Sequence, residues 1–216
     1  MEFMDLIQKR QSVRRYADGD VPVGDIEKMI EAARIAPSAK NLQNWHFIAI
    51  KNKTLIQKVA DATLRANEKI AVKMDAVDPS KADRFRKFAK NFTVFFKDAP
   101  LLIVVMSEQY DPSGYHEMRL VGMDADYLIH EKNPGMQSLG AAVEHLYLRA
   151  IELGYGVCWL TSANYADDEI EALMKEEAGF DKPGYFMAAL LSVGVTEGEP
   201  KSPPKKERSA VLTVVE

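Results

Sequence analysis

The residues best suited to chemistry lie near the start of the chain, in the segment Arg10-Gln11-Ser12-Val13-Arg14-Arg15-Tyr16. Each of its arginines offers a rigid fork of donors that matches two oxygens of a phosphate. Ser12 adds a small hydroxyl donor beside which a ligand can approach the backbone closely. These residue types predict a site for a phosphorylated ligand. The alternative is a solvated basic helix end, because cations also stabilise the C-terminus of a helix.

A second polar stretch follows one helix later, from Ala36 to Phe47, and reads APSAKNLQNWHF before the strand-like Ile48-Ala49-Ile50. The two stretches and their spacing resemble the nitroreductase family of flavin enzymes. Its members open with Arg-x-Ser-x-(Arg or Lys) and continue, after a helix, with Pro-Ser-x-x-Asn-x-Gln-Pro-Trp and a strand. Asn44 stands where the family usually has the second proline. The order of elements fits from residue 2 to the C-terminus, so the resemblance covers essentially the whole chain.

The resemblance implies that flavin mononucleotide (FMN) is the cofactor. It implies that the phosphate is held by four side chains from the two ends of the chain: Arg10, Ser12, Lys206 and Arg208. Gln11 is expected to contact the ribityl chain or the phosphate. Arg14 occupies the position where the family keeps a cation, and a positive charge there stabilises the negative charge that reduction leaves near N1 of the ring.

The resemblance also implies an intertwined homodimer in which each flavin contacts both subunits. The second stretch of one subunit is expected to lie against the ring and ribityl chain of the flavin in the other, through Pro37, Ser38, Ala39 and Asn41, with Gln43 close by. Backbone groups around Leu160, Thr161 and Ser162 are expected to face the N5 and O4 edge of the ring.

The activity that follows from the resemblance is hydride transfer from NADH or NADPH through FMN N5 to an electron-poor small molecule. The expected acceptors are nitroaromatics, quinones or free flavins, and the expected mechanism is ping-pong. Because the proton can come from solvent, no catalytic side chain is assigned. The alternatives are a reductive dehalogenase, a flavin-consuming enzyme, a non-catalytic flavin-binding protein, and a structural dimer without flavin. The physiological acceptor and the choice between NADH and NADPH stay open.

Other kinds of catalytic site lack a sequence signature. The four histidines are scattered, no pair has metal-ligand spacing, and Cys158 is the single cysteine, so no metal site is predicted. His46 is interpreted as a packed or capping residue and Cys158 as a small buried hydrophobe. Neither a dinucleotide-binding glycine motif nor a Walker loop is present. An enzyme with this sequence therefore needs a cofactor to carry its chemistry.

Composition favours an ordinary globular protein. The 216 residues are 47% hydrophobic and 28% charged, and we expect a single domain over residues 1–216. The net charge of −4 gives no reason to expect nucleic-acid or membrane binding. Because the first residues show no basic stretch leading into an apolar one, we expect no secretory signal there. No apolar run reaches the length of a membrane span, and the single cysteine suits a reducing compartment. We expect a cytoplasmic location.

Interleaved helices and strands indicate an α+β fold, and the resemblance implies three layers with a mostly antiparallel central sheet. Hydrophobic periodicity predicts helices over 2–11, 23–36, 53–74, 80–96, 135–153 and 167–174, and strands over 45–51, 100–106, 157–160 and 185–195. Residues 53–98 are expected to form a helical cap, whose phenylalanines are interpreted as core unless a pocket is found. Residues 107–133 are irregular and a candidate lid. Residues 197–216 are expected to form an arm that reaches the partner subunit.

Overall fold

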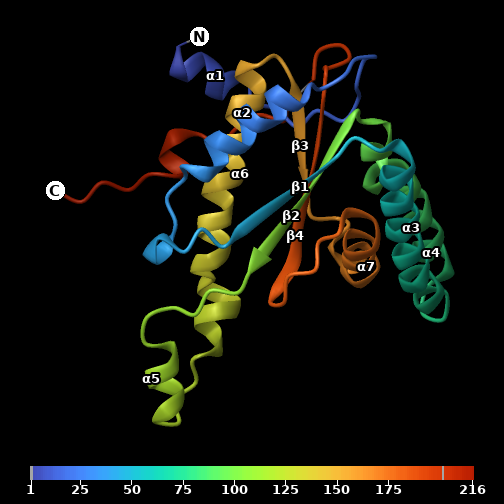
Figure 1. Ribbon diagram of the computed structural model, residues 1–216. Coiled ribbons are helices and arrows are strands. Elements are labelled where there is room, and N and C mark those ends of the chain that lie inside the picture. The colour runs from blue at the N-terminus through green and yellow to red at the C-terminus, as the bar shows by residue number, and fades with distance from the viewer. Residues whose placement is uncertain (1, 201) are drawn as a thin grey trace.

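In the part of the chain that the structure describes, four strands form one antiparallel sheet in the order β1-β2-β4-β3, shown in Figure 1. Their bounds are β1 (Trp45–Ile50), β2 (Leu101–Glu108), β3 (Gly156–Leu160) and β4 (Tyr185–Gly194). The structure is a computed structural model that describes residues 2–200 and 202–216. Strands β2 and β4 are central and almost completely buried, as expected for continuous apolar runs covered on both faces. The prediction of a mostly antiparallel sheet is confirmed.

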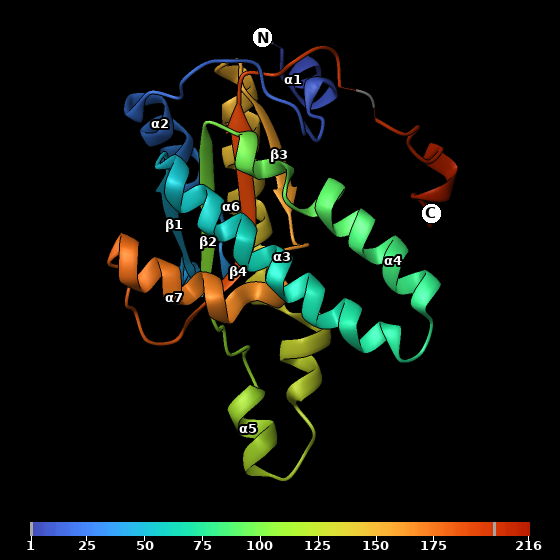
Figure 2. The ribbon, with the colours of Figure 1, turned by 90° about the vertical axis from the view of Figure 1, so that its right-hand side faces the viewer.

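Helices cover both faces of the sheet, which confirms the α+β class. They are α1 (Phe3–Lys9), α2 (Val23–Arg34), α3 (Lys53–Asp75), α4 (Pro79–Phe88), α5 (Tyr115–Leu120), α6 (Pro134–Glu152) and α7 (Asp167–Ala178). Helices α2 and α6 pack together on one face, and α3 and α7 lie on the other with α4 outside α3 (Figures 1 and 2). None of the helices in the described residues is long and apolar enough to cross a membrane.

Strand β2 divides its side chains between two hydrophobic cores. Leu101, Ile103 and Val105 point into the core with α2 and α6. Leu102, Val104 and their neighbour Met106 point into the core with α3 and α7. This alternation follows from the two-residue period of a strand, which places successive side chains on opposite faces.

Two predicted segments differ from the structure. The helix predicted over 80–96 is interrupted, because α4 ends at Phe88 and is followed by a π-helical turn, Ala89–Thr93, and a 3₁₀ turn, Phe95–Asp98. The segment 107–133 holds α5 and a π-helical turn, Leu128–Lys132, and protrudes from the sheet (Figure 2). Its role as a lid stays a prediction.

The C-terminal arm runs away from the sheet (Figure 1). Every residue from 202 to 216 is exposed, although the arm ends in an apolar segment, residues 211–215. Exposed fractions of 68% for Val211 and 91% for Val215 leave these side chains without cover from their own chain. The expected contact with a partner subunit stays a prediction.

Candidate functional site

The arginine segment is attached to the open edge of the sheet, beside β3. Ser12 forms a parallel bridge with Val157, and the Val13 amide donates to the Val157 carbonyl at 2.9 Å. In this extended backbone, Val13 is 4% exposed, whereas Arg14 points outward and is exposed. The sheet edge therefore presents the polar side chains of the segment to solvent or to a ligand.

Two tyrosines, the buried Tyr147 and the half-buried Tyr16, hold this segment in place. The Tyr147 hydroxyl, on α6, lies 2.6 Å from the Gln11 carbonyl and 2.5 Å from the Val157 carbonyl, so it donates to one of the two at a time. The Tyr16 hydroxyl lies 2.9 Å from the Val13 carbonyl. Burial raises the pKa of both hydroxyls, that of Tyr147 to about 12, so both are donors at neutral pH.

The cations of the segment are available to an anion. Within residues 2–200 and 202–216, Arg10, Arg14 and Arg15 form no ion pair with a carboxylate. The Arg10 guanidinium lies 5.7 Å from the ring centroid of Tyr147. The buried Oε1 atom of Gln11 has no hydrogen-bond partner among the described residues, so it can accept from a ligand donor.

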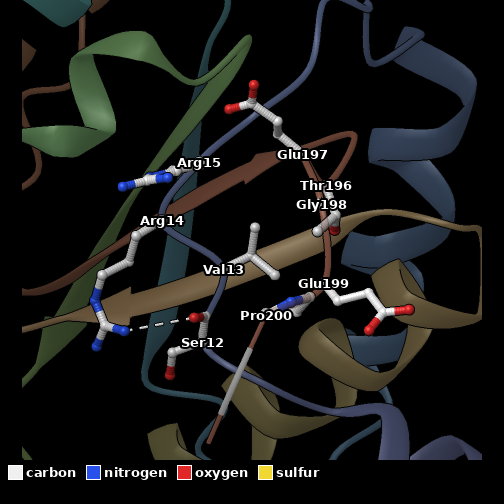
Figure 3. Close-up of a pocket in the computed structure, with 9 residues that line it drawn as sticks. All are labelled: Ser12, Val13, Arg14, Arg15, Thr196, Glu197, Gly198, Glu199 and Pro200. Atoms are coloured by element: carbon white, nitrogen blue, oxygen red, sulfur yellow. Dashed lines mark hydrogen bonds between the residues drawn. The ribbon is translucent and has the colours of Figure 1, made fainter.

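Two cavities adjoin at Arg14. The first, about 510 Å³, lies between residues 12–15 and 196–200, with Arg14 and Arg15 on one side and Glu199 on the other (Figure 3). The second, about 480 Å³, is lined by Arg14, Phe88, Phe92, Phe95, Cys158, Trp159, Leu160, Thr161 and Ser162. The structure thus brings Arg14 and residues 160–162, predicted from distant parts of the sequence, to one cavity.

The second predicted stretch forms a tight turn beside the N-terminal part of α6. The Ser38 hydroxyl accepts from the Gln43 amide at 3.0 Å, and the Ala39 amide donates to the Ser138 hydroxyl at 3.1 Å. Asn41 and Gln43 have φ values of 54° and 51°, in the left-handed region. Pro37, Asn41 and Gln43 are exposed, so the turn presents polar groups outward.

Helix α6 keeps the two predicted groups apart within one chain. Ser138 contacts the second stretch and Tyr147 contacts the first. Nine residues of α-helix correspond to about 13.5 Å along the axis and two and a half turns, so these side chains leave α6 on opposite sides. The arginine segment and the 37–43 turn therefore do not meet around one cavity of a single subunit.

The two predicted basic residues of the arm lie elsewhere. Lys206 and Arg208 are exposed, and neither makes an ion pair in the described part of the chain. The structure does not place them beside Arg10 within the subunit, and their role in phosphate binding stays a prediction.

Sequence reasoning missed several residues that build the site. Asn44, the departure from the family motif, is 1% exposed. Its side-chain NH2 group lies 3.1–3.4 Å from Ser107 Oγ, the Glu108 carbonyl and the Gly135 carbonyl, so its two hydrogens are shared among three acceptors. It joins the starts of β1 and α6 to the end of β2. The place of Asn44 within the family motif could have pointed to it from the sequence. Tyr147 and Ser138 could not be found in this way, because they lie in a helix that the sequence marks only by its apolar pattern.

Three further kinds of site were considered in the described residues: a metal site, a histidine base and a reactive cysteine. No group of three or more His, Cys, Asp and Glu side chains in residues 2–200 and 202–216 could hold a metal ion. His46 stacks on Phe180 at 4.6 Å, and burial together with the nearby Lys182 ammonium lowers the pKa of His46. Cys158 is buried, and that burial raises the pKa of its thiol.

The chain is similar to known proteins over most of its length. The crystal structure of a BluB-like flavoprotein from Clostridium difficile 630 is 52% identical, with a TM-score of 0.96 and 100% of each chain covered. A Thermotoga neapolitana iodotyrosine deiodinase is 30% identical over 96% of this chain and 94% of its own. A Methanothermobacter thermautotrophicus protein, provisionally named NADH dehydrogenase/NAD(P)H nitroreductase, is 25% identical over 81% of this chain and 68% of its own.

The family resemblance in the two polar stretches is confirmed by a match over most of the chain. The model of the Nitroreductase family matches residues 7–195, a range that includes the arginine segment, the 37–43 turn and all four strands. This chain therefore belongs to the Nitroreductase family.

Proposed function

We propose that the protein is an FMN-dependent oxidoreductase that passes hydride from NADH or NADPH to an electron-poor small molecule. The observation that carries the proposal is the arginine segment: its cations have no carboxylate partner in the described residues, and it borders two adjoining cavities. Membership of the Nitroreductase family and 52% identity to a flavoprotein support a flavin as the ligand.

The residues present fit FMN. Arg10 and Ser12 offer the donors that a phosphate requires, and the unpartnered Oε1 of Gln11 suits a hydroxyl donor such as the ribityl chain carries. Arg14 brings a positive charge to the cavity that residues 160–162 line. When bound, FMN supplies the redox chemistry, because it accepts two electrons from a nicotinamide and passes them to another substrate. The side chains of the protein bind the FMN and orient it.

A homodimer is part of the proposal. The opposite placement of Ser138 and Tyr147 on α6 leaves the 37–43 turn without access to the arginine segment of its own subunit. A second copy can bring its turn, with Pro37, Ser38, Ala39, Asn41 and Gln43, to that segment. The exposed apolar arm is consistent with such an assembly, which would also bring Lys206 and Arg208 into use.

Reductive dehalogenation is the second candidate function. It is favoured by the similarity to an iodotyrosine deiodinase over almost the full length of both chains. Release of iodide from iodotyrosine by the chemically reduced protein, with no reduction of quinones, would favour this function over the first.

The test is an anaerobic visible spectrum of the purified protein, recorded before and after NADH and then NADPH. We expect flavin absorption that bleaches with one or both nucleotides and returns when a quinone is added. Loss of that absorption during turnover with oxygen would favour the flavin-consuming alternative. A protein that stays colourless after incubation with FMN would contradict the proposal.

Arg10→Ala tests the phosphate assignment in the same assay. Loss of a charge-assisted hydrogen bond should raise the dissociation constant of FMN roughly 10- to 100-fold. Arg34→Ala is the control, because Arg34 is an exposed arginine whose guanidinium is paired with Glu31 on α2. Equal FMN affinity in the two variants would count against the assignment.

A further inference from the structure

Strand β4 extends beyond the end of its neighbour β3. The last pair between the two strands joins Leu160 to Leu190, and in the described part of the chain no strand lies beside residues 185–189 on that side. The backbone donors and acceptors of such an edge need other partners, because leaving them buried and unpaired costs free energy.

Two side chains take the place of the missing strand. The Nδ2 atom of Asn164 donates to the Ala188 carbonyl at 2.8 Å. One residue earlier on β4, the Met187 amide donates to Oε1 of Glu171, on α7, at 2.6 Å. Ala188 has no partner in β2 either, because the register of the β2–β4 pair shifts by one residue there, as in a β-bulge.

Asn164 also closes the turn by which the chain leaves β3. Its backbone amide donates to the Thr161 carbonyl at 3.1 Å. Its Oδ1 atom is buried and has no hydrogen-bond partner among the described residues. The bond from Nδ2 to the Ala188 carbonyl is therefore the side-chain hydrogen bond that attaches this turn to the sheet.

The turn carries two backbone amides that can bind a ligand. Thr161 and Ser162 line the cavity of about 480 Å³ with Arg14, and neither amide has an acceptor in the part of the chain that is described. The Val157 carbonyl accepts from the Val13 amide on the outer side of β3. The two-residue period of a strand turns the Thr161 amide to that same outer side.

We propose that Asn164 is a positioning residue for the flavin: by holding residues 161–162 on β4, it keeps a backbone amide directed at N5 of the ring. This inference rests on the proposed function and adds to it a residue that does not line the flavin cavity. An amide stabilises the N5 lone pair only at hydrogen-bond distance and in line with it. A turn released from Ala188 loses that contact.

The test compares two flavins on the full-length protein, freed of flavin, of the Asn164→Ala variant. FMN accepts a hydrogen bond at N5, whereas 5-deaza-FMN carries a C–H group there and keeps the rest of the molecule. We expect the dissociation constant of FMN to rise roughly 3- to 10-fold and that of 5-deaza-FMN to rise less than about twofold. Hydrogen exchange of residues 161–164, measured without flavin, should become faster.

Glu171→Ala is the matched control. It removes the hydrogen bond to the neighbouring residue of the same strand edge, and Glu171 does not line the flavin cavity. It should lower the free energy of unfolding as Asn164→Ala does. Both flavin dissociation constants should stay within about twofold of those of the unmodified protein.

Asn164→Asp keeps the shape of the side chain and serves if the alanine variant folds poorly. A carboxylate cannot donate to the Ala188 carbonyl, whereas a protonated carboxyl can. Burial raises the pKa of such a carboxyl, so FMN affinity relative to the unmodified protein should be low at about pH 8 and recover towards about pH 5. A defect of packing alone would not respond to pH.

Two results would overturn the proposal: unchanged FMN affinity in Asn164→Ala, or an equal loss of affinity for FMN and 5-deaza-FMN. The same pattern of losses in Glu171→Ala would also overturn it, because any damage to this edge would then act alike. Failure of the proposed function is distinguishable, because the unmodified protein would then bind neither flavin.

Discussion

Tyr147 helps to hold the arginine segment in place through one hydroxyl group. That hydroxyl lies within hydrogen-bond distance of the Gln11 and Val157 carbonyls, and the ring carries the Arg10 guanidinium on its face. The residue joins α6, β3 and the segment at one point. It is a positioning residue for the phosphate-binding groups, since none of its own atoms is assigned to the ligand.

Tyr147→Phe should weaken FMN binding more than riboflavin binding. Removal of the hydroxyl frees the Gln11 backbone, and a typical hydrogen bond of about 0.5–1.5 kcal/mol corresponds to a loss of roughly 2- to 12-fold in FMN affinity. Riboflavin keeps the ribityl chain but lacks the phosphate, so its affinity should fall less than that of FMN. Quenching of flavin fluorescence in the apoprotein measures both dissociation constants.

Tyr155→Phe is the control for this variant. It also removes a tyrosine hydroxyl, one that donates to Asp25 Oδ2 at 2.7 Å and does not contact the arginine segment. An equal loss of FMN and riboflavin affinity in Tyr147→Phe would show general destabilisation in place of a role in phosphate positioning.

At the scale of elements, the close approach of the arginine segment to β3 depends on a glycine. A Cβ atom at Gly156 would lie 2.3 Å from Thr196 Oγ1 and 2.6 Å from a methyl group of Val13. Both contacts are shorter than atoms tolerate, so a side chain there forces the segment away from the sheet edge.

Gly156→Ala should therefore lower the free energy of unfolding by about 1–3 kcal/mol and weaken FMN binding. Urea denaturation and fluorescence titration measure the two effects. Gly24→Ala, in α2, is the control, because a Cβ atom there meets nothing within 4 Å and alanine is the better helix residue. Equal stability of the two variants would show that the approach of the segment to β3 is loose.

At the scale of the whole molecule, the separation of the two motifs across α6 makes a testable statement about assembly. Suppose that each flavin lies between the arginine segment of one subunit and the 37–43 turn of the other. A dimer of two different variants, one altered in each motif, then carries both alterations in the same flavin site. Arg10→Ala weakens the first motif. Asn41→Gly removes a side chain of the second and keeps the positive φ of 54°, which glycine adopts readily.

A mixed dimer of these two variants should regain one site of normal affinity. Each homodimer carries one defect in both sites, whereas the mixed dimer carries both defects in one site and none in the other. At an FMN concentration between the normal and weakened dissociation constants, we expect about one flavin for each mixed dimer and much less for either homodimer. No recovery in the mixed dimer would show that both motifs serve a site within one subunit.

Much of the fold could be predicted because its elements have clear periods. The apolar runs of β2 and β4 and the three-and-four spacing in α6 are local features, and they indicated strands and a helix close to the observed bounds. The interrupted helix after Phe88 escaped prediction, since the π-helical turn is held by Asn67 from another helix. The hydrophobic periodicity of a segment does not indicate which distant residues contact it.

By itself, the sequence was enough for the family, the fold class and the two motifs, because these depend on residue types at short, fixed spacings. The tertiary structure decided which residues meet. It brought Arg14 to residues 160–162, turned Phe88 and Phe92 toward that cavity, buried Asn44, and placed Ser138 and Tyr147 on opposite sides of α6. The physical reason is that packing between distant segments determines how exposed each side chain is and which side chains it contacts. A local sequence pattern does not contain this information.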